Sequence, residues 1–155
     1  MVSPKFAVLL AIGVAAPALA GPLMLTSDVR VEKRVAASDG TTRTECARAD
    51  RVVPGDRVVF VLNYRNTGTA PLADVVLANP VPKGMLYRSA ANGSAAPELS
   101  VDGKTYGTLA ALRVPAIGGG MRAAGPDDVT NVRWRLTSPI TAGSSGQLAF
   151  QAVIK

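Results

Sequence analysis

The sequence predicts an all-β protein, an antiparallel β-sandwich of about seven to nine strands. Apolar and polar residues alternate in several runs, most clearly over 57–65 and 129–136. Turn-forming residues separate these runs, as in Pro54-Gly55-Asp56 and Asp102-Gly103. No stretch after residue 20 has the pattern and length of a helix. Because strands with one apolar face need a second sheet to cover it, a sandwich is the expected arrangement.

The N-terminus is typical of a secretory signal peptide. Lys5 precedes an apolar run over 6–16, and Ala18-Leu19-Ala20 has the small residues that a signal peptidase accepts. An uncleaved anchor is the alternative, but the run is short for a bilayer, which needs about 20 residues. We expect cleavage after residue 20, a short leader over 21–27 and a single domain over 28–155. Without a second apolar run, no transmembrane anchor is expected in the mature protein, which would be periplasmic or at the cell surface.

Composition and charge favour one soluble globular domain. The chain has 155 residues, of which 48% are hydrophobic and 18% charged. The formal net charge of +6 would suit anionic lipid or polysaccharide. However, the basic residues are dispersed among acidic ones and only 5% of residues are aromatic, which argues against nucleic-acid binding.

Each strand is expected from its own pattern. Val29, Val31 and Lys33 fall on one face of a strand that starts near residue 28, and 41–50 is a candidate edge strand or ordered loop. The alternating run 57–65 is the strongest strand, and Pro80 and Pro82 prevent the next one, 72–78, from continuing as a central strand.

The second half of the chain supplies the remaining strands. The chain is expected to re-enter the sheet at 84–87. A hairpin is expected over 98–108, with Asp102-Gly103 at its turn. The glycine-rich segment 109–128 is expected to be mobile. Strands follow at 129–136 and 147–154.

The order and spacing of several short segments resemble an Ig-like bacterial surface repeat, the conserved repeat domain called domain of unknown function eleven. The resemblance covers roughly residues 26–155. It is carried by Pro54-Gly55-Asp56-Arg57-Val58-Val59-Phe60, Asn66-Thr67-Gly68-Thr69, Val75 to Met85, Val101 to Gly107, Val132-Arg133-Trp134-Arg135-Leu136 and Ile140 to Gly146.

The resemblance implies an exported Ig-like β-sandwich of the bacterial envelope or cell surface, structural or adhesive and without known enzyme activity. One position departs from the pattern. The family usually has Asp before its Pro-x-Pro segment, where this chain has Asn79. Either side chain can cap the turn locally.

The residue types argue against common catalytic chemistry. The chain has no histidine, which is the commonest general base and metal ligand. Cys46 is the only cysteine, so it is expected to be a small buried hydrophobe, with an intermolecular disulfide as the alternative. Asp127 and Asp128 are too few for a calcium site without further ligands, and a solvated loop is the better interpretation. No cofactor is expected, and a monomer is favoured.

Lys33 supports one specific hypothesis, an intramolecular isopeptide bond with Asn79. Asn63 and Asn66 are further candidates for the asparagine, and Glu32 or Asp74 for the acid. Burial would lower the pKa of the lysine and free its amine to attack the amide. The favoured alternative is that Lys33 extends its amine to water at a sheet edge.

Taken together, the sequence predicts an exported, non-enzymatic structural or interaction module. It would present the loops 88–97 and 109–128, or an exposed edge strand, to an envelope protein or polysaccharide. The alternative is a carbohydrate- or small-ligand-binding module, for which exposed aromatic residues would be needed. The candidates are Trp134, Tyr64, Tyr87 and Tyr106.

Overall fold

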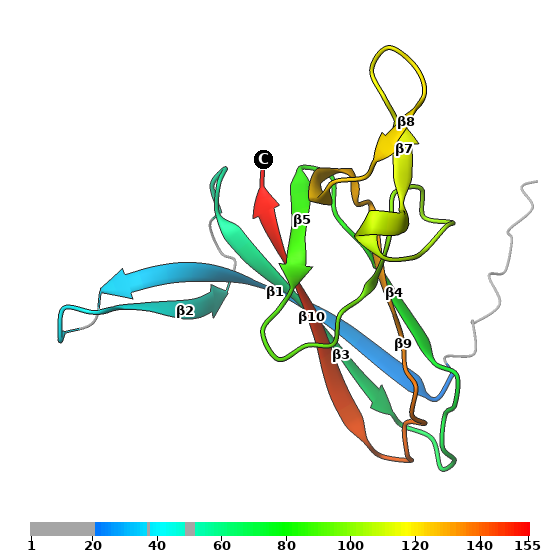
Figure 1. Cartoon of the computed structure of the whole chain (residues 1–155). Helices are drawn as coiled ribbons and strands as arrows, with labels where there is room; N and C mark the ends of the chain where they lie inside the picture. Colours follow the sequence, from blue (N-terminus) through cyan, green and yellow to red (C-terminus); the bar gives the residue numbers. More distant parts are fainter. Residues whose placement is uncertain (1–20, 37, 49–51) are drawn as a thin grey trace, which may run out of the picture.

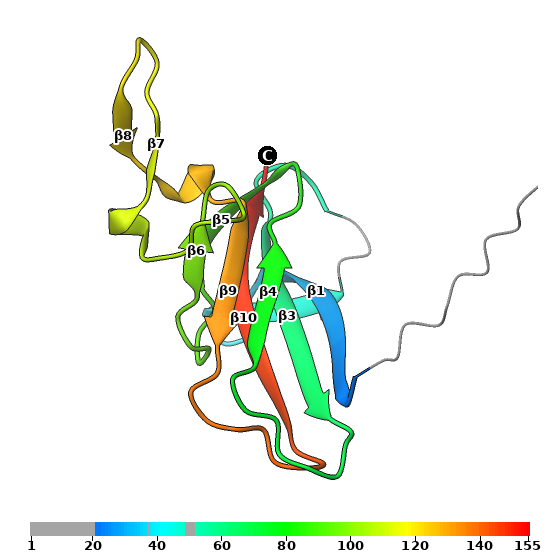
Figure 2. The ribbon, with the colours of Figure 1, turned by 90° about the vertical axis from the view of Figure 1, so that its right-hand side faces the viewer.

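The computed structural model describes residues 21–36, 38–48 and 52–155, apart from the side chains of 33–36 and 42–48. It shows two antiparallel sheets that pack together, as predicted (Figures 1 and 2). The larger sheet has five strands in the order β2-β1-β3-β10-β5. Their bounds are β1 Leu23–Ala36, β2 Thr42–Arg48, β3 Arg57–Asn66, β5 Met85–Ala90 and β10 Ser145–Ile154.

The smaller sheet has three strands in the order β4-β9-β6. A separate hairpin, β7-β8, and two short 3-10 turns complete the described structure. The bounds are β4 Val76–Pro80, β6 Glu98–Ser100, β7 Arg113–Pro115, β8 Met121–Ala123, β9 Asn131–Arg135, η1 Leu109–Ala111 and η2 Pro126–Asp128. Among the described residues, no helix has the length and apolarity needed to cross a membrane.

The central strand of the larger sheet is β3, which pairs with β1 on one side and β10 on the other. Its alternate residues Val58, Phe60 and Leu62 enter the main core. Val59 and Val61 face the other way and are nevertheless buried, because they pack with Ala149 and Ala91 in a second small cluster. Strand β3 is therefore apolar on both faces over most of its length, as a central strand should be.

Phe150 of β10 lies at the centre of the sandwich and is 1% exposed. The Phe60 ring stacks on it with centroids 4.8 Å apart. Trp134, from β9 of the smaller sheet, lies 6.3 Å from the same ring. The Phe60 contact lies within the larger sheet, and the Trp134 contact joins the two sheets through aromatic side chains, whose burial dominates core energetics.

The domain begins earlier than the sequence indicated. The Pro22 carbonyl accepts hydrogen bonds from the Thr67 backbone N–H at 2.6 Å and from its hydroxyl at 2.9 Å. Strand β1 starts at Leu23, whose side chain packs against the core. Residues 23–27, which the sequence assigned to a leader, are thus the first part of β1. Polar residues at 26–28 hid the alternation of this long strand.

Two hairpins project from the sandwich (Figures 1 and 2). One is formed by the far halves of β1 and β2, because β1 pairs with β3 only as far as Glu32 and continues with β2 to Ala36. The other is β7-β8, within the segment expected to be mobile. Its turn contains Gly118, Gly119 and Gly120, all with positive φ, and the Ala116 N–H bonds the Gly120 carbonyl at 3.0 Å. That segment contains regular structure that its glycine content concealed.

The hairpin expected over 98–108 forms only in part. Strand β6 has three residues, and a single bridge joins Leu99 to Gly107. Between them the Asp102 carboxylate accepts backbone N–H groups from Lys104 and Thr105, each at 2.8 Å. This local bonding replaces the ladder of a two-residue turn.

Candidate interaction surfaces

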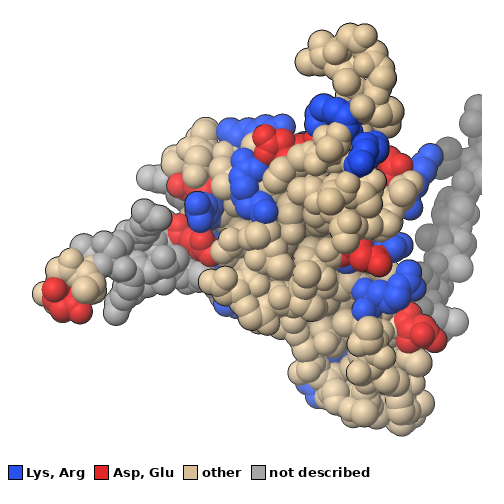
Figure 3. All heavy atoms as spheres, viewed as in Figure 1, with Lys and Arg blue, Asp and Glu red and all other residues tan. Residues whose placement is uncertain are grey.

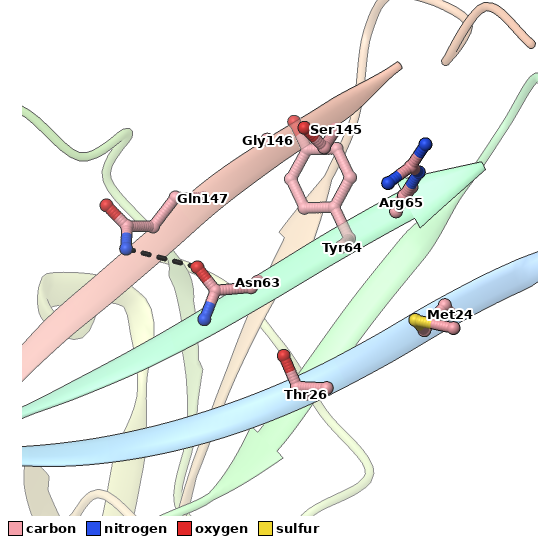
Figure 4. Close-up of a pocket in the computed structure, with 8 residues that line it drawn as sticks. All are labelled: Met24, Thr26, Asn63, Tyr64, Arg65, Ser145, Gly146 and Gln147. Carbon is pink, nitrogen blue, oxygen red and sulfur yellow. Dashed lines mark hydrogen bonds between the residues drawn. The ribbon is translucent and has the colours of Figure 1, made fainter. Parts of the chain in front are cut away.

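A shallow groove of about 500 Å³ lies on the larger sheet, where β1, β3 and β10 run side by side (Figure 4). We call it the polar groove, and it is lined by Met24, Thr26, Asn63, Tyr64, Arg65, Ser145, Gly146 and Gln147. Within it the Gln147 side-chain amide donates a hydrogen bond to Asn63 Oδ1 at 3.1 Å. Amides, hydroxyls and one guanidinium make this a surface for hydrogen bonding to a polar ligand.

The end of the polar groove depends on a glycine and an aromatic ring. Gly146 and Tyr64 are directly opposite each other on β10 and β3. A side chain at position 146 would overlap the Tyr64 ring, so the ring occupies the space that the glycine leaves open. Such glycine–aromatic pairs are a known way to support a glycine within a sheet.

The β7-β8 hairpin provides a different kind of surface. We call residues 116–121 the hairpin tip. Ile117 is fully exposed and Met121 is 63% exposed, whereas Val114 below them packs against the core. Figure 3 shows the tip as an uncharged projection with basic side chains at its base. The tip thus presents two large apolar side chains to solvent on a projecting element.

Ion pairs fix the base of this hairpin. Arg122 donates to both carboxylate oxygens of Asp128, each at 2.7 Å. Hydrogen bonds from Arg122, and to a smaller extent from the Gly125 N–H, lower the pKa of Asp128 to about 2. In turn, Asp128 raises the pKa of Arg122. Arg88 of β5 bonds Asp127 at 2.5 Å and so ties η2 to the larger sheet.

Arg113, on the other strand of the hairpin, is placed differently. Its guanidinium donates to the carbonyls of Ala110 at 2.7 Å and Leu112 at 3.0 Å. In the described part of the chain no carboxylate forms an ion pair with it. Among the described residues, the positive charge of Arg113 at the base of the hairpin thus meets carbonyl oxygens but no carboxylate.

Both acids considered as calcium ligands are engaged with arginines. Asp127 bonds Arg88 and Asp128 bonds Arg122. Across residues 21–36, 38–48 and 52–155, no three Asp, Glu, Cys or His residues cluster as metal ligands would. The two aspartates thus form ion pairs at the base of the hairpin.

The isopeptide hypothesis concerns residues on separate sheets. The Lys33 backbone lies in β1, just beyond its last pair with β3, and the Lys33 side chain lies outside the described residues. Asn79 lies in β4, where its amide donates to the Pro80 carbonyl at 3.1 Å. Of the other candidate asparagines, Asn63 accepts a hydrogen bond from Gln147. The Asn66 side chain is fully buried, and its amide group bonds only to backbone atoms. The bond stays a hypothesis, and an amine that reaches water stays the favoured prediction.

The side chain of Cys46 also lies outside the described residues. Its backbone is in β2, opposite Glu32 of β1. For 41–50 the sequence left an edge strand or an ordered loop open, and the structure has a strand, β2, over Thr42–Arg48 at the edge of the larger sheet. The state of the thiol stays a prediction.

The aromatic residues do not form an exposed platform. Trp134 is 3% exposed and donates its indole N–H to the Ala95 carbonyl at 2.9 Å. Tyr87 is buried, and burial raises its pKa. Tyr106 lies under Arg133, whose guanidinium carbon is 4.0 Å from the ring centroid. An exposed Trp134 beside Tyr106 would favour a sugar-binding module, but Trp134 is buried.

Sequence reasoning missed the features that shape both surfaces. The pairing of Arg122 with Asp128 joins residues six apart across an unrecognised turn, and Gly146 opposite Tyr64 depends on strand register. The charged flanks of the uncharged run 114–121 were visible in the sequence as a signal, but its glycines suggested mobility instead.

Comparisons with protein-family models, with curated proteins and with solved structures found no match to the chain.

Proposed function

We propose that the protein is an exported, non-enzymatic interaction module of the bacterial envelope or cell surface, and that it uses the β7-β8 hairpin as its contact element. The observation that carries this proposal is the exposure of Ile117 and Met121 on a hairpin that projects from a well-packed sandwich. Rigid scaffolds commonly hold binding elements in this way. Export is supported by the signal-like N-terminus, and membership of the Ig-like surface repeat family by the segments that resemble it.

The arrangement of the loops supports the choice of this element. The loop after β5, which was also expected to face a partner, is held to the sandwich. The Ala149 N–H donates to the Ser94 hydroxyl at 2.8 Å, and the Ala95 carbonyl accepts the Trp134 indole. The hairpin tip, in contrast, is free of contacts at Ile117. Of the two predicted loops, the hairpin is the one that reaches away from the body.

A photo-crosslinking experiment tests the proposal. A benzophenone amino acid at position 117 should give crosslinks to envelope material in living cells, whereas the same amino acid at the exposed position Lys83 should give few. Equal crosslinking from both positions would contradict a contact role for the hairpin. Fractionation of the cells checks the expected export at the same time.

Binding of a carbohydrate or another small polar ligand is the second candidate. The polar groove favours it, because Asn63, Gln147, Thr26 and Ser145 offer donors and acceptors on one surface. Glycan binding that is lost in Asn63→Ala but kept in Ile117→Ser would support this candidate over the hairpin.

A further inference from the structure

We propose that the hairpin tip enters the interface of a lipid bilayer that carries anionic headgroups. This inference deepens the proposed function, on which it depends for the hairpin as the contact element. The first observation is chemical. Residues 114–121 form an uncharged run that ends at Arg113 on one strand and Arg122 on the other. Apolar residues flanked by arginines are typical of segments that lie at membrane interfaces.

The register of the hairpin places both arginines at nearly the same level. Val114 is directly opposite Arg122, and Arg113 is opposite Ala123. Residues 115–121 lie beyond this level, about three on each side of the hairpin. At the usual rise of a strand they extend about 10 Å. This reach matches the depth of about 5–10 Å to which interfacial segments enter the boundary between headgroups and acyl chains. Ile117 would then lie among acyl chains while the guanidinium groups stay with the phosphates.

The composition of the tip favours a lipid surface over a pocket in a protein. Gly118, Gly119 and Gly120 have no side chains, so the tip offers only Ile117 and Met121 for recognition. Protein pockets usually recognise aromatic or arginine anchors with directional contacts. A bilayer interface requires only apolar surface and positive charge. The backbone agrees with shallow insertion, since Ala116 and Gly119 N–H groups already bond to carbonyls within the tip.

Charge at the base of the hairpin supports anionic headgroups. Arg113 and Arg122 lie on the two strands of the hairpin and Arg88 bonds η2 beside it, and Asp127 and Asp128 compensate two of these three charges. Arg113 has no carboxylate partner among the described residues, so it is the charge available to a phosphate. We therefore expect binding to be stronger on anionic vesicles and weaker at high salt.

Vesicle co-sedimentation of the full chain tests the proposal. The vesicles contain either phosphatidylglycerol with phosphatidylethanolamine, or phosphatidylcholine alone. The double variant Ile117→Ser/Met121→Ser should bind anionic vesicles at least about tenfold more weakly than the parent, because two apolar side chains lose their burial. Arg113→Gln should weaken binding to anionic vesicles by about fivefold and leave binding to phosphatidylcholine unchanged.

Val53→Ser is the matched control. Val53 is 55% exposed, similar to Met121, but lies in the turn before β3. This variant should bind as the parent does, and residues 6–16 are the same in every protein compared. Circular dichroism melts confirm that each variant is folded.

Two outcomes would overturn the inference: no binding of the parent to anionic vesicles, or equal binding of the parent and the Ile117→Ser/Met121→Ser variant. If vesicles are not bound but position 117 crosslinks to an envelope protein, the lipid partner is wrong and the contact role of the hairpin remains. If position 117 crosslinks no more than Lys83 and vesicle binding is unaffected by the tip variants, both proposals fail.

Discussion

At the scale of single residues, Asn66 joins the two loops at one end of the sandwich. Its side chain is fully buried, and its amide donates to the carbonyls of Ala70 at 2.8 Å and Ile140 at 2.9 Å. Its Oδ1 accepts the Gly68 N–H at 2.9 Å. Every hydrogen-bonding atom of the amide group therefore has a protein partner. Its removal takes one donor from the Ala70 carbonyl and leaves the buried Ile140 carbonyl with the Leu72 N–H alone.

We expect Asn66→Ala to lower the free energy of unfolding by about 2–4 kcal/mol, measured by urea denaturation. Asn63→Ala is the control, because Asn63 is on the same strand and makes one exposed hydrogen bond to Gln147. That variant should change stability by about 0.5 kcal/mol or less. Similar losses of unfolding free energy in the two variants would show that the buried hydrogen bonds of Asn66 stabilise the fold no more than an exposed one does.

Gly146 gives a second prediction at this scale. A methyl group at this position would overlap the Tyr64 ring, so Gly146→Ala should destabilise the protein by about 1–3 kcal/mol. The clash is with one side chain, and Gly146 is not among the glycines with positive φ. In a Tyr64→Ala background the same substitution should therefore cost much less. A double-mutant cycle measures this coupling, and additive effects would contradict it.

At the scale of elements, hydrogen-bonded aspartates set the acid stability of two turns. The pKa of Asp102 is lowered to about 2, chiefly by hydrogen bonds from the Lys104 and Thr105 backbone, and the pKa of Asp128 is lowered to about 2 by Arg122. Because the folded state favours the ionised carboxylates, their contribution is fully present above about pH 4. It is lost as the pH falls toward 2.

The double variant Asp102→Asn/Asp128→Asn should therefore lose less stability between pH 4 and pH 2 than the parent does, as followed by thermal melts across this range. Asp74→Asn is a suitable control, because Asp74 is exposed and asparagine tolerates its φ of 53°. An unchanged slope in the double variant would show that other groups dominate acid unfolding.

Elements with long alternating patterns were predictable from the sequence, and those defined by turns were less so. Strand β3 has an alternating run, and the structure confirms it almost to the residue. Strand β4 ends at Pro80 as an edge strand, as its prolines required. In contrast, β7 and β8 have three residues each, too few for an alternating pattern to be recognised. Three consecutive glycines lie in the turn between them. Their turn is closed by the hydrogen bond from the Ala116 N–H to the Gly120 carbonyl, and Arg122 ties β8 to η2. A pattern of hydrophobicity records neither contact.

At the scale of the whole molecule, the core and the hairpin tip have separate tasks. Phe150 contacts aromatic rings from both sheets, so it joins the two layers. The tip residues Ile117 and Met121 are exposed and contribute little to this packing. The sandwich was predictable because many one-sided strands require it. The division between a stabilising core and an exposed tip was not, because Ile and Met in a sequence look the same whether buried or exposed.

This separation can be tested by shortening the hairpin. Pro115 and Met121 form the last pair of the β7-β8 ladder, so residues 116–120 can be replaced by Asn-Gly, which favours a two-residue turn. We expect the shortened chain to unfold with a free energy within about 0.5 kcal/mol of the parent, whereas Phe150→Ala should cost about 3–5 kcal/mol. Urea denaturation measures both. The shortened chain should also lose the contacts made through position 117, since it lacks the surface that makes them. A large loss of stability on shortening would mean that the tip supports the fold, and its exposed apolar residues would then need another explanation than contact with a partner.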